Sequence, residues 1–149
     1  GRGGSLSGSE PCEPGRSDER KVAEVSPLVL AYVGDAVWEL HVRSQLVAER
    51  GADSRVNELH GLAKRAVNAE SQSFMVHALM EYLDDEERDV VRRGRNARPG
   101  HVPRAFGPAD YRYATGFEAL LGFLYLTGRT DRLGEVLDVA RRLVDGVGR

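Results

Sequence analysis

Apolar residues recur at helical spacing from residue 26 almost to the end of the 149-residue chain. Ser26 and Pro27 are a typical helix start, since Ser caps free N–H groups and Pro suits the first helical position. No segment shows the convincing apolar–polar alternation of a half-buried strand. The pattern predicts an all-α fold, with helices at 27–48, 54–67, 70–82, 84–94, 110–127 and 130–144.

Two of these helices show finer patterns. The helix over 84–94 begins with Asp84 and Glu87 spaced as a capping box, and Gly94 is expected to end it. Residues 95–109 hold three Pro and two Gly, which predicts a loop. For the helix over 70–82, the apolar residues predict one side formed by Phe74, Met75, Ala78, Leu79 and Tyr82.

The composition of the chain indicates how it is divided and in which setting it folds. Gly, Ser, Pro and charged residues dominate the N-terminal segment, so we expect a disordered tail over 1–25 and one domain over 26–146. Cys12 is the only cysteine, which excludes an intramolecular disulfide and favours a reducing, cytoplasmic setting. No apolar run approaches the roughly 18–20 residues that span a bilayer, so no membrane partner is expected. The net charge of −2 means that nucleic-acid binding would need a local basic patch.

Two acidic residues, Asp35 and Glu118, lie within otherwise apolar helical stretches. A carboxylate among apolar neighbours is costly to bury unless a cation pairs with it. If the two helices pack together, the two carboxylates could hold Mg²⁺, which prefers oxygen ligands and activates water towards a phosphodiester. Gly34 and Gly122 lie close by in sequence and would allow the backbones, or a ligand, to approach closely.

Ordinary ion pairing is the alternative interpretation of these acids. Arg43 and Arg112 are available as salt-bridge partners, and Glu39, one turn beyond Asp35, is interpreted as structural. Periodicity alone leaves this alternative open and makes it the more common case.

Arginine dominates the segment from 88 to 112, and its planar fork suits contacts with phosphate. A solvated charged loop would have the same composition, so this pattern alone leaves nucleic-acid contact open. The residues that we expect to contact RNA backbone are Arg93, Arg95, Asn96, Arg98 and Arg104, with Lys64, Arg65 and Arg112 as a second group.

The segments LVLAYVGDAVWELHVR (28–43) and YRYATGFEALLGFLYL (111–126) resemble the two signature helices of the ribonuclease III family. The RGRNA segment at 93–97 and the NELH stretch at 57–60 are similar to motifs of its short bacterial branch, Mini-ribonuclease III. The resemblance extends over residues 26–144, and the motifs occur in the family's order.

This resemblance implies a helical homodimer with a valley for double-stranded RNA and one metal site in each subunit. Asp35 matches the Asp of the first motif and Glu118 the Glu of the second, so both are implied to be catalytic and to bind Mg²⁺. Hydrolysis leaving 5′-phosphate and 3′-hydroxyl ends, and the maturation of pre-23S ribosomal RNA, are implied as well. A separate double-stranded-RNA-binding domain is not expected, and assistance by a ribosomal protein stays open.

The chain lacks several acidic residues that full-length ribonuclease III has near the two motifs. Leu28, Ala31 and Thr115 stand where that enzyme has further carboxylates, which implies fewer protein ligands and more water around the metal. Glu70 lies in a stretch where relatives tend to be basic. Two alternatives therefore remain: a catalytically inactive RNA-binding or ribosomal module, and a purely structural helical dimer.

Overall fold

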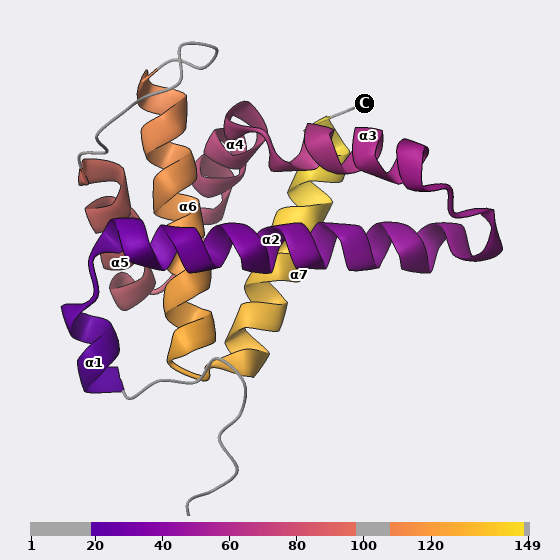
Figure 1. Ribbon diagram of the computed structural model, residues 1–149. Coiled ribbons are helices and arrows are strands. Elements are labelled where there is room, and N and C mark those ends of the chain that lie inside the picture. Colours follow the sequence, from indigo (N-terminus) through magenta and orange to yellow (C-terminus); the bar gives the residue numbers. More distant parts are fainter. Residues whose placement is uncertain (1–18, 98–107, 148–149) are drawn as a thin grey trace, which may run out of the picture.

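The computed structural model describes residues 19–97 and 108–147, and every regular element in those ranges is a helix. The all-α prediction is therefore confirmed (Figure 1). Within the same ranges, no helix is long and apolar enough to cross a membrane. The elements in chain order are α1 (Glu19–Glu24), α2 (Pro27–Arg50), the short 3-10 helix η1 (Gly51–Asp53), α3 (Val56–Val67), α4 (Ala69–Leu79), α5 (Asp85–Asn96), α6 (Pro108–Leu126) and α7 (Thr130–Val147).

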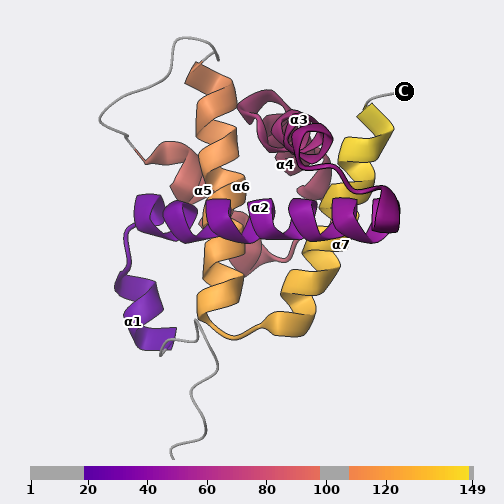
Figure 2. The same ribbon diagram turned by 45° about the vertical axis from the view of Figure 1, so that its right-hand side comes forward.

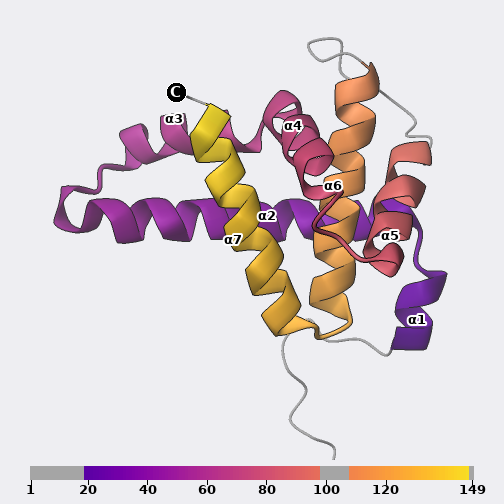
Figure 3. The ribbon, with the colours of Figure 1, turned by 180° about the vertical axis from the view of Figure 1, so that it is seen from behind.

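Helix α6 is the centre of the fold. Figure 1 shows α2 crossing one side of it, and the view from behind in Figure 3 shows α4 and α5 flanking it. Figure 2 shows α7 returning beside α6 after a short turn. A helix covered on several sides must be apolar around most of its circumference, and Phe117, Leu120, Leu121 and Leu124 of α6 are fully buried.

Helix α2 begins as the sequence predicts. The Ser26 side chain accepts the N–H of Leu28, and Pro27 occupies the first helical position. Further along α2, the buried indole of Trp38 donates to the carbonyl of Ala66 in α3 at 3.1 Å. Its ring also meets Phe117 of α6 edge-on, with ring centroids 5.3 Å apart. Trp38 therefore joins α2, α3 and α6 and orients α2 across the central helix.

The segment expected to be a tail differs from that expectation at residues 19–24, which form α1. Val22 is 2% exposed and belongs to the core, and Glu19 pairs with Arg129 at 3.6 Å. One buried valine in a charged turn carries almost no periodic signal, which is why composition alone missed this helix. Residues 1–18 lie outside the described ranges.

Gly94 does not end its helix, contrary to the prediction, because α5 continues to Asn96. Gly94 is buried, and a Cβ placed on it would lie 2.8 Å from the Cα of Gly116 in α6. The glycine therefore permits a close crossing of α5 and α6. The capping box of Asp84 and Glu87 at the other end of α5 is present as predicted.

The buried side of α4 also differs from the prediction. Phe74 and Tyr82 are exposed, and the helix ends at Leu79 rather than at 82. The side that packs against the core is made of Gln72, Ser73, Met75, Val76 and Leu79. Met75 and Leu79 are buried as predicted, but the buried side is turned away from Phe74 because two of its residues, Gln72 and Ser73, are polar.

Candidate active site

The closest approach between helices in the site is the crossing of α2 and α6, which depends on two glycines. A Cβ on Gly34 would lie 1.7 Å from the backbone oxygen of Glu118, and a Cβ on Gly122 would lie 1.9 Å from that of Leu30. No side chain fits at such distances, so only glycine allows these backbones to touch. The expectation that Gly34 and Gly122 permit close approach is confirmed for the backbones.

This crossing brings the carboxylates of Asp35 and Glu118 into electrostatic contact. The pKa of Glu118 is raised to about 8, mainly by burial and next by the nearby charge of Asp35. Asp35 is exposed at the surface, but partial desolvation and the charge of Glu39 raise its pKa as well. Two acids from helices far apart in sequence therefore share one site and destabilise each other's charge.

Neither acid is neutralised by a basic side chain of residues 19–97 or 108–147. Among the described residues, no salt bridge is formed by Asp35 or Glu118, and Arg112 instead donates its Nε to the carbonyl of Arg95 at 3.1 Å. The ordinary ion-pair interpretation is therefore wrong for Arg112, and Arg43 is exposed without an ion pair in the described part of the chain. The ionised form of this pair therefore has no counter-charge among the described residues, and a bound cation would supply one.

Gln72 of α4 is a site residue that the sequence interpretation missed. Its side chain is 1% exposed, its Nε2 donates to the carbonyl of Val67 at 3.3 Å, and its hydrogen bond to Glu118 counteracts the rise in that pKa. A signal was available, because Gln72 precedes the buried Met75, Val76 and Leu79 at helical spacing. A polar residue at such a position must find a buried hydrogen-bond partner.

Glu39 is nearer to the site than its structural interpretation implied. Its charge raises the pKa of both Asp35 and Glu118, although its contribution to Glu118 is the smallest of those that act there. No group of three or more His, Cys, Asp or Glu side chains in the described ranges is arranged to hold a metal ion together. Asp35 and Glu118 are thus the carboxylates that could hold a cation here, and Glu39 acts on both through its charge.

Two hard oxygen donors with unbalanced charge fit a divalent cation such as Mg²⁺, which typically binds to one or two carboxylates and completes its shell with water and phosphate. The positions that differ from larger relatives add no ligands. Ala31 is buried, and the Thr115 hydroxyl donates to the carbonyl of Tyr111 at 2.9 Å within α6.

The expected RNA-contacting residues fall into two groups on opposite sides of α6 (Figure 1). Arg93, Arg95 and Asn96 lie in the last turn of α5, joined to Arg112 of α6 by the bond to the Arg95 carbonyl. Lys64 and Arg65 are exposed in the last turn of α3. Arg98 and Arg104 lie outside the described residues.

The sequence pattern of the Ribonuclease III domain matches residues 28–129. This range covers more than half of the chain and contains both Asp35 and Glu118. The chain belongs to the ribonuclease III family. The resemblance inferred from the motifs is therefore confirmed.

Individual ribonuclease III relatives agree with this assignment. "Mini-ribonuclease 3" of Symbiobacterium thermophilum is 50% identical over 119 residues, which cover 80% of this chain and 90% of the relative. "Mini-ribonuclease 3" of Gloeobacter violaceus is 48% identical over 120 residues, which cover 80% and 85%. A crystal structure of a Fusobacterium nucleatum protein superposes with a TM-score of 0.72 at 27% identity, covering 82% of this chain and 96% of that one.

Membership of the ribonuclease III family makes this chain an endoribonuclease that acts on double-stranded RNA. Enzymes of the family are generally metal-dependent, and their hydrolysis typically leaves 5′-phosphate and 3′-hydroxyl ends. The crossing of α2 and α6 is thus a structural explanation for the two signature motifs, since each motif carries one glycine and one acid of the same site.

Proposed function

We propose that this protein cleaves double-stranded RNA in a Mg²⁺-dependent reaction, with Asp35 and Glu118 holding the ion and pre-23S ribosomal RNA as the substrate. The observation that carries the proposal is the unpaired carboxylate pair at the α2–α6 crossing, in which burial and Asp35 raise the pKa of Glu118 to about 8. The similarity to proteins named Mini-ribonuclease 3 supports the ribonuclease activity, and the ribosomal substrate is the one that the resemblance of the motifs implies.

The chain's own side chains have separate tasks in this proposal. The ion, when bound, supplies activation of water and stabilisation of the charge that develops on the phosphate. Asp35 and Glu118 hold the ion, so the free energy lost by crowding two carboxylates is recovered when a cation binds. Gln72 directs an amide N–H at Glu118 and thereby favours its ionised form.

The basic end of α5 is proposed to bind RNA backbone. Arg93 and Asn96 are exposed there, and the exposed Arg112 is tied to the same turn through the Arg95 carbonyl. Guanidinium groups form strong paired hydrogen bonds with phosphate oxygens. Lys64 and Arg65 on α3 are proposed as a second backbone contact, and the proposal extends to Arg98 and Arg104.

The proposed active form is a homodimer that buries the outer face of α2. Figures 1 and 3 show α2 on the outside of the helical assembly, with one of its sides uncovered. Val29, Tyr32, Leu40 and Val47 form an exposed apolar stripe along α2, with Tyr32 81% and Leu40 68% exposed. An apolar stripe of this kind is typical of protein–protein contact.

Cleavage and binding of a long RNA duplex test the catalytic assignment. We expect wild-type protein to cut the duplex in Mg²⁺ and not in EDTA, and Asp35→Asn or Glu118→Gln to lose more than about a hundredfold in rate while still binding it. Even changes outside the direct ligands cost about 10–100-fold at metal sites. Binding without cutting in any divalent metal would favour an inactive module, and neither activity would favour a structural protein.

Sedimentation analysis tests the dimer separately. Leu40→Asp should convert the dimer to monomer, because it places a charge in the apolar stripe. Val56→Asp is the matched control, since Val56 is equally exposed at 68% but lies at the start of α3, where an acid is favourable. A monomeric wild-type protein, or a dimer that survives Leu40→Asp, contradicts this part of the proposal.

A further inference from the structure

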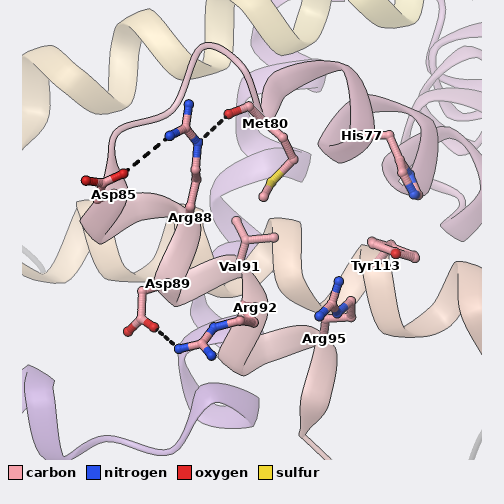
Figure 4. A pocket seen from close by; sticks show the side chains of 9 residues that line it. All are labelled: His77, Met80, Asp85, Arg88, Asp89, Val91, Arg92, Arg95 and Tyr113. Atoms are coloured by element: carbon pink, nitrogen blue, oxygen red, sulfur yellow. Dashed lines mark hydrogen bonds and ion pairs between the residues drawn. The ribbon is translucent and has the colours of Figure 1, made fainter.

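A cleft of about 370 Å³ lies on the side of the molecule where the end of α4, the helix α5 and the first half of α6 meet (Figure 4). It is separate from the carboxylate pair, and none of its lining residues carries the catalytic assignment. Its volume lies at the lower end of the range typical of small-molecule sites, about 300–1,000 Å³. A duplex cannot enter a space of this size, but a group as large as one nucleotide can.

One wall of the cleft is aromatic and cationic. The rings of His77 and Tyr113 lie 4.0 Å apart between centroids, and the Arg95 guanidinium carbon lies 5.6 Å from the Tyr113 centroid. Figure 4 shows the three side chains lying next to one another, contributed by α4, α6 and α5. His77 is anchored through Nδ1, which donates to the carbonyl of Ser73 at 2.7 Å because a carbonyl can only accept.

The middle of the cleft is apolar. Figure 4 shows the Met80 and Val91 side chains between the His77–Tyr113–Arg95 group and the charged side chains on the far side. A thioether is polarisable and makes favourable contacts with flat aromatic groups. The cleft thus offers an aromatic pair with a soft apolar surface beside it.

The charges in the cleft leave one cation unbalanced. Arg88 is occupied by the carbonyl of Met80 at 2.7 Å and by Asp85 at 3.3 Å, and Arg92 is paired with Asp89. Arg95 has no carboxylate partner among the described residues, only the Tyr113 ring. A ligand that suits the cleft is therefore flat, aromatic and anionic.

We propose that this cleft binds a single unpaired nucleotide, with the base against the His77–Tyr113 pair and the phosphate on Arg95. Aromatic side chains bind bases of any sequence by stacking, and guanidinium groups bind phosphate. This inference rests on the proposed function, because Arg95 belongs to the α5 end that we assign to RNA backbone. The nucleotide is either part of a strand that extends beyond the duplex or a free nucleoside monophosphate.

Fluorescence anisotropy in EDTA, which prevents cutting, tests the proposal with two RNA duplexes. One is blunt, and the other carries a short single-stranded 3′ extension. Wild-type protein should bind the extended duplex about five- to tenfold more tightly, the lower part of the range for stacking one base. In a third arm, calorimetry measures the binding of adenosine 5′-monophosphate and of uridine 5′-monophosphate. This arm shows whether the cleft binds a free nucleotide.

Substitutions at Tyr113 decide whether the cleft is responsible. Tyr113→Leu should abolish the preference for the extended duplex and any monophosphate binding, with the affinity for blunt duplex unchanged. Tyr113→Phe keeps the ring and should retain the preference. Tyr111→Leu is the matched control, since Tyr111 is also half-buried on α6 but does not line the cleft. Circular dichroism melts show whether each variant is folded.

The possible outcomes separate this inference from the nuclease assignment. Equal affinity for both duplexes together with no monophosphate binding overturns the cleft, as does a preference that survives Tyr113→Leu. Monophosphate binding without a preference supports the cleft and assigns it to the free nucleotide. If no duplex is bound at all, the proposed function fails, while monophosphate binding that Tyr113→Leu removes still supports the cleft.

Discussion

Two glutamates in this protein show how differently a fold can treat a carboxylate. Glu87 on α5 is 1% exposed, yet its pKa is lowered, first because Arg132 of α7 hydrogen-bonds it at 2.7 and 2.8 Å. Glu118 on α6 has its pKa raised to about 8 by burial and by Asp35. The first carboxylate is paired within the chain, and the second has no cationic partner in the part of the chain that the structure describes.

This contrast separates structural from functional burial of charge. The Glu87–Arg132 pair joins α5 to α7, and the backbone N–H of Asp84 occupies a further acceptor position on Glu87. Both oxygens of the Glu87 carboxylate therefore already accept hydrogen bonds within the protein. At the α2–α6 crossing none of the basic side chains in residues 19–97 and 108–147 supplies the counter-charge, and our proposal assigns that part to a bound metal ion.

The largest expected effect comes from removing the crossing itself. Gly34→Ala places a Cβ within 1.7 Å of the Glu118 backbone oxygen, so the helices must separate. We expect a loss of about 3 kcal/mol or more in the free energy of unfolding, at the upper end for overpacking. Denaturant unfolding measures it.

Gly134→Ala is the control for this change, because nothing lies within 4 Å of a Cβ there. It should stabilise α7 by about 0.5–1 kcal/mol, as Ala is the better helix former. A small gain of the same size for Gly34→Ala would mean that helix propensity rather than the crossing governs that position.

The next prediction tests the ion pair between Glu87 and Arg132. Glu87→Gln leaves Arg132 without its buried counter-charge, and we expect a loss of about 2 kcal/mol, below the figure for fully buried pairs because Arg132 is 26% exposed. Glu86→Gln breaks only the exposed pair with Arg129 and should cost about 0.5 kcal/mol or less. Equal costs in thermal or denaturant unfolding would remove the distinction between the two pairs.

The stability of the protein should depend on pH through Glu118, the carboxylate without a cationic partner among the described residues. Because the pKa of Glu118 rises from an ordinary 4.5 to about 8 on folding, the folded state holds its proton where the unfolded state has released it. Metal-free protein should therefore lose stability as pH rises from about 5 to 8, by about 1.5 kcal/mol given the remaining solvent contact. The melting temperature followed across this range in EDTA measures the effect.

Glu118→Gln should flatten this dependence, and Mg²⁺ should oppose it by favouring the ionised carboxylate. The pH dependence of Glu87→Gln is the comparison for Glu118→Gln, because the pKa of Glu87 is lowered on folding whereas that of Glu118 is raised. An unchanged slope in Glu118→Gln would show that other groups cause the loss of stability.

The smallest expected effect concerns Gln72. Gln72→Leu removes the amide that favours the ionised form of Glu118, so Mg²⁺ binding at neutral pH should weaken about fivefold, equivalent to one hydrogen bond of about 1 kcal/mol. Calorimetric titration with Mg²⁺ measures this. Ser73→Ala, a neighbouring buried position on α4, should leave Mg²⁺ affinity unchanged, and equal weakening in both would indicate a general packing effect.

Much of the local structure was predictable because it depends on local interactions. Ser26, Pro27 and the Asp84–Glu87 box start their helices as expected, since caps satisfy N–H groups within one turn. The helices over 19–24 and the buried side of α4 were not predicted. Val22 is buried by tertiary packing that its charged sequence neighbours do not indicate, whereas Gln72 shares helical spacing with buried apolar residues but is itself polar.

The sequence by itself determined the all-α class, the helix starts and the two signature motifs with Asp35 and Glu118. Only the tertiary structure decided that Gly94 is a contact residue, that Arg112 binds a carbonyl, and that the two acids interact without a cationic partner among the described residues. The reason is physical. Helical periodicity depends on neighbours three and four residues away, whereas the raised pKa of Glu118 depends on two helices that meet across more than eighty residues of chain.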